Sequence, residues 1–294
     1  MQPPITYQSI QKKTKALADS FRFITRKTIG KSYLGKKIEA LSFGYGQKSL
    51  IMTACHHGSE HLTAALLADF AEELALSIES GDSRFALKVR SLLEYRRLIL
   101  LPCVNPDGMT LATEGLGEDF PNAERLQRLN HQKKDFSHWQ ANARGVDLNH
   151  NYNYRFGEYK HLEKANGITE GATRFSGEYP ESESETRAVC RLIREEGRDL
   201  AGVLSFHSQG EVIYYHDAPN TRHGAHFLSR LTGYALDTAD GLSAYGGLTD
   251  WLSTEGIPAF TIEIGKGQNP LPDSLSPLLY ATLRETLFRS LAFF

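Results

Sequence analysis

Residues 50–60 read LIMTACHHGSE, and this stretch decides the fold class. Its first six residues form an uncharged apolar run, which is typical of a strand buried on both faces of a sheet. The polar cluster at 56–60 follows directly, and residues 61–78 then place Leu62, Leu66 and Phe70 on one face of a helix. This order of strand, polar turn and amphipathic helix is typical of α/β proteins.

Three further apolar runs predict buried strands at 97–104, 201–206 and 259–264. Amphipathic patterns at 182–196 and 276–294 predict two more helices. The alternation predicts an α/β fold with a mixed, mostly parallel central sheet that helices cover on both faces. No internal repeat or linker composition divides the chain, so we expect residues 1–294 to form a single domain.

The composition limits the classes of partner. The chain has 33 basic and 35 acidic residues and a formal net charge of -2, which argues against a nucleic-acid partner. No stretch approaches the roughly 18 apolar residues of a membrane span, and residues 1–9 are polar. Three cysteines are too few, and an odd number, for a disulfide framework. We therefore expect a cytoplasmic protein without a membrane partner.

Polar residues follow or end the predicted strands. In open α/β sheets, ligand sites lie beyond the carboxyl ends of the strands, so these residues are expected to converge on one cleft. His57 and Glu60 form an H-x-x-E pair at a strand-to-helix turn, and His207 ends another apolar run. Two histidines and one glutamate leave the fourth position of a tetrahedral site for water, which is a ligand set of catalytic zinc.

The H-x-x-E pair alone is a weak signal, and each of the three residues also has a purely structural interpretation. His57 would then bond to the backbone, Glu60 would be a first-turn carboxylate favoured by the helix dipole, and His207 would be a buried, hydrogen-bonded histidine. His56 is expected to point to the opposite side from His57 and has no predicted role.

A series of motifs in a fixed order resembles the zinc carboxypeptidase family. They are HGSE at 57–60, NPDG at 105–108, GVDLN at 145–149, His207, and FTIEIG at 260–265. Residues 29–38 resemble the family's entry segment, so the resemblance covers residues 7–294. It implies a zinc-carboxypeptidase-like fold, a zinc metallopeptidase activity, and one Zn²⁺ per chain bound by His57, Glu60 and His207.

The resemblance assigns roles to two further carboxylates. Glu263 would be the general base that takes a proton from water at the metal. A glutamate on a solvated strand face is the poorer alternative, because its neighbours in 260–264 are apolar. Asp147 would accept a hydrogen bond from a zinc-binding histidine, in this chain His57, and so fix its tautomer. Alternatively, Asp147 caps a turn before Asn149.

The chain departs from the family's pattern at the oxyanion site. Family members hold an arginine near the scissile carbonyl, two residues before the asparagine that Asn142 matches, and this position is Gln140 here. Arg144 is close enough in sequence to replace it as the oxyanion donor, or an amide donates alone.

A second departure lies at His150, beside Asn149, where ordinary carboxypeptidases carry an arginine. That arginine grips the terminal carboxylate of the substrate through a bidentate fork, which a histidine cannot reproduce. A requirement for a free C-terminus is therefore weakened, unless Arg155, Arg174 or Arg144 supplies a replacement cation.

Residues 246–251, GGLTDW, resemble a segment of the family that follows a mobile tyrosine. Tyr245 directly precedes this segment instead of lying several residues upstream, so its position departs from that of the family's lid tyrosine. Leu248 and Thr249 match positions that shape the specificity pocket, and both are uncharged. The candidate substrate-binding residues are Asn149, His150, Gln140, Tyr245 and Thr249.

Residues 207–214 and 263–272 resemble the bacterial γ-D-glutamyl-L-diamino-acid endopeptidases, and residues 139–149 fit the same branch. These enzymes cut peptidoglycan stem peptides between D-glutamate and a diamino acid such as meso-diaminopimelate. The predicted partner is a peptide or muropeptide, and no separate wall-binding module is visible. The alternatives are an ordinary metallocarboxypeptidase, which predicts arginine at position 150, and a noncatalytic peptide-binding relative, which predicts loss of a ligand or base. A zinc deacylase of the aspartoacylase type does not account for the later motifs.

Overall fold

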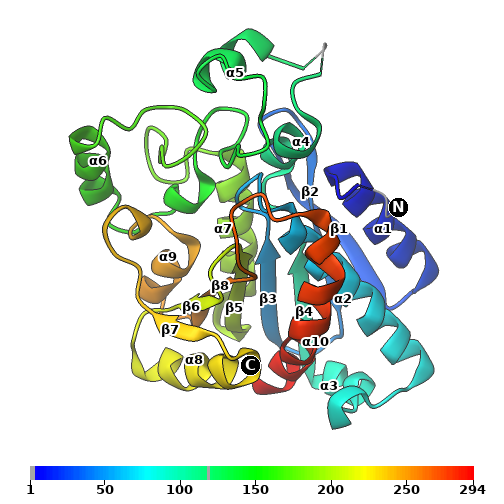
Figure 1. Ribbon diagram of the computed structural model, residues 1–294. Helices are drawn as coiled ribbons and strands as arrows, with labels where there is room; N and C mark the ends of the chain where they lie inside the picture. The colour runs from blue at the N-terminus through cyan, green and yellow to red at the C-terminus, as the bar shows by residue number, and fades with distance from the viewer. Residues whose placement is uncertain (1–3, 118–119) are drawn as a thin grey trace.

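The computed structural model describes residues 4–117 and 120–294, and it contains one eight-stranded sheet (Figure 1). The strands are β1 (Ile24–Lys31), β2 (Lys37–Phe43), β3 (Lys48–Ala54), β4 (Arg96–Leu101), β5 (Leu200–His207), β6 (Val212–Tyr214), β7 (Ala235–Asp237) and β8 (Ala259–Glu263). Their order in the sheet is β1-β2-β4-β3-β5-β8-β6-β7.

The centre of the sheet is parallel and its margins are mixed. β3 pairs in parallel with β4 and β5, and β5 pairs in parallel with β8. β2 is antiparallel to both β1 and β4, and β6 is antiparallel to β8 but parallel to β7. This topology confirms the mixed, mostly parallel sheet expected from the sequence.

The helices connect the strands and close the chain. They are α1 (Tyr7–Ser20), α2 (His61–Ser80), α3 (Val89–Tyr95), α4 (Pro106–Glu114), α5 (Ala123–Leu129), α6 (Phe156–Ala165), α7 (Ser184–Glu196), α8 (Pro219–Thr232), α9 (Leu248–Thr254) and α10 (Ser276–Phe293). Short 3₁₀ helices are η1 (Arg84–Ala86), η2 (Leu148–His150), η3 (Gly197–Asp199), η4 (Gly241–Ser243) and η5 (Asp273–Leu275).

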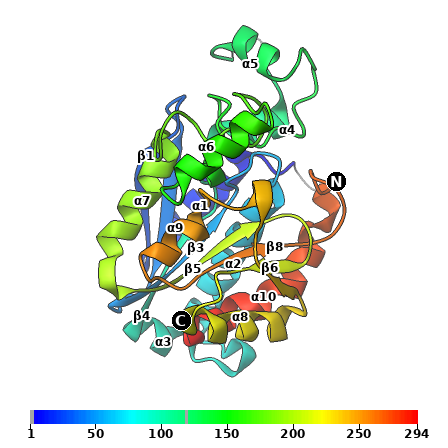
Figure 2. The same ribbon diagram turned by 90° about the vertical axis from the view of Figure 1, so that its left-hand side faces the viewer.

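Helices cover both faces of the sheet, as predicted. α2 and α10 pack on one side of the central strands and α7 and α9 on the other (Figure 1), and in Figure 2 α7 and α9 lie to the left of the strands and α10 to the right. Met52 and Phe206 pack with α1, α2, α3, α8 and α10 in one core cluster. Ile51 and Val203 pack with α7 and α9 in a second core cluster. Adjacent residues of β3 thus belong to opposite cores, which accounts for its continuous apolar run.

The four strands predicted from apolar runs are present as β3, β4, β5 and β8, and the three predicted helices as α2, α7 and α10. The apolar-run criterion does not find β1 and β2. Four of the eight residues of β1 are exposed and all four carry Thr or Lys side chains, so this strand has no continuous apolar run.

The strand ends place the candidate functional residues at one edge of the sheet. The segment carrying His57 and Glu60 follows β3, while His207 and Glu263 are the last residues of β5 and β8. No helix within residues 4–117 and 120–294 has both the length and the apolar character needed to cross a membrane.

Candidate metal centre and active site

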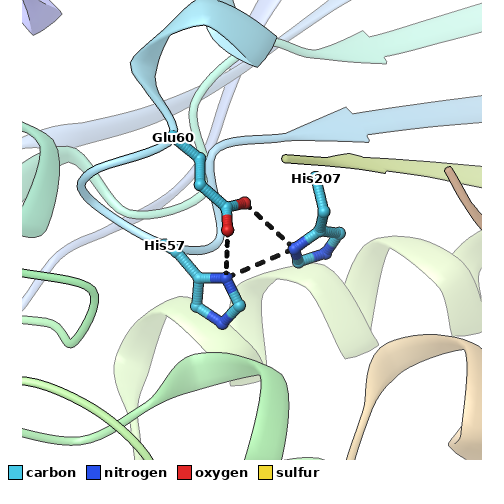
Figure 3. A group of neighbouring side chains, drawn as sticks. All are labelled: His57, Glu60 and His207. Atoms are coloured by element: carbon cyan, nitrogen blue, oxygen red, sulfur yellow. Dashed lines mark hydrogen bonds and ion pairs between the residues drawn. The ribbon is translucent and has the colours of Figure 1, made fainter. Parts of the chain in front are cut away.

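His57, Glu60 and His207 meet at this edge of the sheet, although 146 residues separate Glu60 from His207 (Figure 3). Nδ1 of His57 lies 2.9 Å from Oε1 of Glu60, and Nδ1 of His207 lies 3.1 Å from Oε2 of the same carboxylate. The two Nδ1 atoms lie 3.3 Å apart. One ligand atom from each residue is within 4.8 Å of the others, so the group could hold one metal ion.

The other ring nitrogens of the two histidines have their own partners. Nε2 of His57 lies 3.2 Å from Oδ1 of Asp147, and its N–H donates a hydrogen bond to that carboxylate. Nε2 of His207 lies 3.2 Å from Oγ of Ser205, which in turn accepts a hydrogen bond from the Thr53 hydroxyl. Both rings are therefore oriented with Nδ1 directed at the centre of the group.

This donor set fits zinc. Oε2 of Glu60 is buried and makes no hydrogen bond among the described residues, because its 3.1 Å contact with Nδ1 of His207 lacks hydrogen-bond geometry. A polar atom at the centre of the group is thus left unsatisfied. Burial acts to raise the pKa of Glu60, but His57 and His207 lower it to about 2, which keeps the carboxylate ionised. Two imidazole nitrogens and one carboxylate are a common protein ligand set of catalytic zinc.

A tight turn fixes His57 and Glu60. A side chain at Gly58 would place Cβ only 2.3 Å from the backbone of Gly108, so glycine lets the turn lie against α4. The Asn105 amide donates to the carbonyl oxygens of His56 and Gln140, and its side-chain oxygen accepts from the N–H of Gly108. The NPDG motif thus ties the turn of the metal site to the start of α4.

Asp147 connects the metal site to two neighbouring segments. Besides binding His57, Oδ1 accepts the Asn149 N–H at 3.1 Å, and Oδ2 accepts the Arg174 N–H at 2.9 Å. Burial acts to raise its pKa, but His57, His150 and the Arg174 N–H hold the pKa of Asp147 well below its usual range. Asp147 therefore stays ionised while it orients His57, and it also caps η2 at Asn149.

Glu263 lies beside the metal group in a cleft of about 950 Å³. His57, Glu60 and Asp147 line the same cleft. Burial first, and then the Glu60 carboxylate, raise the pKa of Glu263 well above its usual range. A carboxyl group in this position is suited to accept and return a proton.

The other predicted substrate-binding residues, Asn149, His150, Gln140, Tyr245 and Thr249, also line the cleft. Nδ1 of His150 donates to the Tyr245 carbonyl oxygen at 2.9 Å, and its ring stacks on Tyr159 at a centroid distance of 4.2 Å. The Thr249 hydroxyl lies 3.0 Å from that of Thr261, which gives this part of the cleft an uncharged polar lining.

Tyr245 is held by its neighbours in the cleft wall. The Arg155 guanidinium lies 4.5 Å from the centroid of its ring, and the Tyr154 ring stacks against it at 6.4 Å. Gly246 follows in a left-handed conformation, with no room for a side chain beside the His150 backbone. Tyr245 is therefore packed against Arg155 and Tyr154, on the same side of the cleft as His150.

The structure corrects the expectation for Arg144. Its guanidinium lies 3.7 Å from Glu183 and 4.0 Å from Glu178, and 5.8 Å from the centroid of the Tyr33 ring. Arg144 is not among the residues that line the cleft, because its side chain is directed to these acidic groups instead. Gln140 does line the cleft, and its Oε1 accepts a hydrogen bond from the Thr173 hydroxyl.

His56, which is expected to point away from His57, does not line the cleft but packs close to the metal group. Its ring stacks on His207 at a centroid distance of 5.4 Å, and its Nε2 lies 3.0 Å from the Tyr152 hydroxyl. Strand alternation does not apply there, because β3 ends at Ala54 and Cys55 has a positive φ of 55°. His56 therefore packs directly behind a metal-binding residue.

Two further features of the cleft were not predicted. Nε2 of His216 lies 2.7 Å from Oδ1 of Asp250, and both residues line the cleft. Asp250 belongs to the GGLTDW segment, which was a usable signal, whereas no pattern marks His216. Arg174 also lines the cleft, where the sequence offered it only as one of three replacement cations.

Comparison with known proteins agrees with this geometry. The family model described as zinc carboxypeptidase matches residues 10–226. Gamma-D-glutamyl-L-diamino acid endopeptidase 1 of Lysinibacillus sphaericus is 31% identical over 280 residues, which are 93% of this chain and 69% of that protein. Murein peptide amidase A of Escherichia coli (strain K12) is 28% identical over 223 residues, which are 71% of this chain and 79% of that protein. The solved structure of thrombin activatable fibrinolysis inhibitor shares the fold, with a TM-score of 0.73 at 18% identity over 98% of this chain and 73% of that chain.

Proposed function

The chain belongs to the zinc carboxypeptidase family and is a zinc metallopeptidase, and on that premise we propose that it hydrolyses the bond between γ-D-glutamate and the diamino acid of peptidoglycan stem peptides. The observation that carries this substrate assignment is the environment of His150. Its Nδ1 is engaged by the Tyr245 carbonyl and its ring is stacked on Tyr159, so this position offers no bidentate fork for a terminal carboxylate.

The residues that would bind the zinc ion are His57 and His207, each through Nδ1, and Glu60 through its carboxylate. Asp147 and Ser205 hold the opposite ring nitrogens, so the two rings are oriented before the ion binds. When bound, zinc lowers the pKa of water and polarises the scissile carbonyl.

Glu263 acts as the general base and then as the general acid. It ends β8 directly beside His207, at the wall of the cleft, where it can accept a proton from the attacking water. Its raised pKa lets the same carboxyl group return a proton to the leaving amine. A noncatalytic relative would have lost a ligand or this base, and all four residues are present here.

The oxyanion of the tetrahedral intermediate forms on the side of the cleft lined by Gln140. The side-chain NH₂ group of Gln140 can donate a hydrogen bond to this oxyanion. The Gln140 side-chain oxygen accepts from the Thr173 hydroxyl, and this bond fixes the orientation of the planar amide. We assign the binding of the leaving diamino acid to Asn149, His150, Tyr245 and Thr249, which line the same cleft.

The relatives support the substrate class. The name of the Lysinibacillus sphaericus relative states cleavage at a γ-D-glutamyl-L-diamino acid bond, and that of the Escherichia coli relative refers to murein peptides. The match to the first of these covers 93% of this chain, so it includes the segments that carry all four proposed catalytic and metal-binding residues.

The test is incubation of the zinc-loaded protein with L-Ala-γ-D-Glu-meso-diaminopimelate, followed by mass spectrometry of the products. We expect L-Ala-D-Glu and free diaminopimelate, no products after treatment with a chelator, and recovery when zinc is restored. Absence of cleavage of this peptide by protein that carries stoichiometric zinc would overturn the proposed substrate.

A further inference from the structure

Arg174 occupies a fixed place on the cleft wall. Its N–H donates to Oδ2 of Asp147 at 2.9 Å, and its carbonyl oxygen accepts from the Tyr159 hydroxyl at 2.8 Å. Between these two anchors the residue adopts a left-handed conformation with φ of 68°. A non-glycine residue held in this region by buried partners indicates that the surrounding structure determines where its side chain begins.

The guanidinium of Arg174 differs in its surroundings from that of Arg155, which also lines the cleft. Nε of Arg155 donates to Oε1 of Glu158 at 2.7 Å, and the group lies over the Tyr245 ring. Arg174 is exposed, and within the part of the chain that the structure describes it has no carboxylate within ion-pair distance. Its planar fork of donors is therefore available to a carboxylate in the cleft.

The position of Arg174 relative to the metal group defines a side of the cleft. The Asp147 carboxylate links the Arg174 backbone to the His57 ring, because it accepts a hydrogen bond from each of them. Thr173, the neighbour of Arg174, donates to Gln140, so these residues form one wall. His150 bonds to Tyr245 and its ring stacks on Tyr159, the residue whose hydroxyl donates to the Arg174 carbonyl. Arg174 is therefore linked to Gln140 through Thr173 and to His150 through Tyr159.

We propose that Arg174 determines specificity by binding the free α-carboxylate of the γ-D-glutamyl residue, on the acyl side of the scissile bond. This inference rests on the proposed function. A γ-linked glutamyl residue keeps its α-carboxylate free, a short methylene chain away from the scissile carbonyl, whereas an α-linked residue uses that group in the peptide bond. A guanidinium on the cleft wall that also carries Gln140 thus recognises a carboxylate that most α-linked residues lack.

The test compares kcat/KM for two stem peptides that differ only at this carboxylate. One contains γ-D-glutamate, and the other contains γ-D-isoglutamine, in which the α-carboxylate is an amide. We expect the wild-type protein to prefer the free carboxylate by on the order of 10- to 100-fold, which is the range for a charge-assisted pair. Arg174→Gln should lose that preference by slowing only the γ-D-glutamate substrate, and Arg174→Lys should keep part of it.

Arg198→Gln is the matched control, because it removes one exposed arginine at the opposite end of β5 from His207. It should leave both rates unchanged. Thermal melting of each variant checks that the substitutions preserve the fold.

A second comparison separates this inference from the alternative that Arg174 binds a carboxylate of the diamino acid. In that case Arg174→Gln would slow the γ-D-glutamate and γ-D-isoglutamine substrates equally, and its effect would disappear with an amidated diamino acid. Either that result or an unchanged preference in Arg174→Gln would overturn the proposal.

A binding measurement tests the role of Arg174 independently of turnover. Calorimetric titration of zinc-loaded Glu263→Gln with the two stem peptides should show the same preference, which should be lost in Glu263→Gln/Arg174→Gln. If the wild-type protein cleaves neither peptide, the proposed function fails. Equal binding of the two peptides by Glu263→Gln overturns the role of Arg174 in either case.

Discussion

His207 lies directly opposite Glu263 in the register of the parallel pair β5 and β8. Side chains paired in this way point to the same face of a sheet, so the register brings a metal-binding imidazole and a carboxylate side by side. The strands are adjacent in space but 51 residues separate the end of β5 from the start of β8. The sheet topology therefore places the proposed base next to the metal group.

Glu263→Gln is expected to bind zinc normally and to lose at least about 100-fold in kcat, since the amide keeps the shape of the side chain but cannot accept a proton from water. Zinc content and kcat are to be measured on the same preparation. A mutant with near wild-type turnover would assign the general base to another residue.

Asp147→Asn should weaken zinc binding about 10- to 100-fold, because an amide holds the His57 ring and its tautomer less firmly than a carboxylate does. Competition with a chromophoric chelator measures this affinity. Asp135→Asn serves as the control, since Asp135 is an exposed loop residue whose side chain accepts the N–H of Ser137, two residues away. Equal zinc affinity in Asp147→Asn and wild type would remove Asp147 from the metal site.

The sequence predicts the central strands and the metal ligands for the same physical reason. A strand buried on both faces needs an apolar run, and its polar end is then conspicuous, as at His57 and His207. The outer strand β1 is half-exposed and gives no such signal. The sequence also does not predict the direction of side chains in loops. Arg144 lies near Gln140 in the sequence, but its guanidinium pairs with Glu183 and Glu178 instead of lining the cleft.

Backbone conformation explains the remaining difference. Alternation along a strand predicts that His56 points away from His57, and His56 does not line the cleft, but β3 ends at Ala54 and Cys55 has a positive φ, so alternation does not determine where the His56 ring packs. His56 consequently stacks on His207. Neither this φ nor the hydrogen bond from His216 to Asp250 follows from a periodic pattern, because both depend on contacts between distant segments.

His150 should make the enzyme tolerant of stems extended beyond the diamino acid. Substrates with a free, an amidated and a D-Ala-extended diamino acid are expected to differ in kcat/KM by less than about 10-fold, because no bidentate pair is lost among them. A strict requirement for the free carboxylate would restore the carboxypeptidase interpretation.

Glu185→Gln is expected to stabilise the protein at high pH. Burial first, and then the nearby acids Asp107 and Glu183, raise the pKa of Glu185 to about 7 in the folded state. A raised pKa in an acid means that the folded state binds the proton more tightly, so stability falls as pH rises from about 4.5 to about 7.

The amide cannot ionise and removes this cost, which has an upper limit of about 3 kcal/mol above pH 7. Urea unfolding of Glu185→Gln and wild type at pH 5 and pH 8 measures it, with Glu195→Gln, an exposed position of the same helix, as the control. A stability difference that does not change with pH would show that Glu185 titrates normally.

The ratio of kcat/KM for two isomeric peptides tests the central claim most directly. The zinc-loaded protein is given L-Ala-γ-D-Glu-meso-diaminopimelate and its α-linked isomer in one reaction, and the release of diaminopimelate from each is followed by mass spectrometry. We predict cleavage of the γ-linked peptide with a preference of at least about 100-fold, as expected when the site fits a glutamyl residue whose acylated α-carbon adjoins the free carboxylate, because in the α-linked isomer that carbon adjoins the scissile carbonyl instead. Equal cleavage of both isomers, or faster release from the α-linked peptide, would contradict the account.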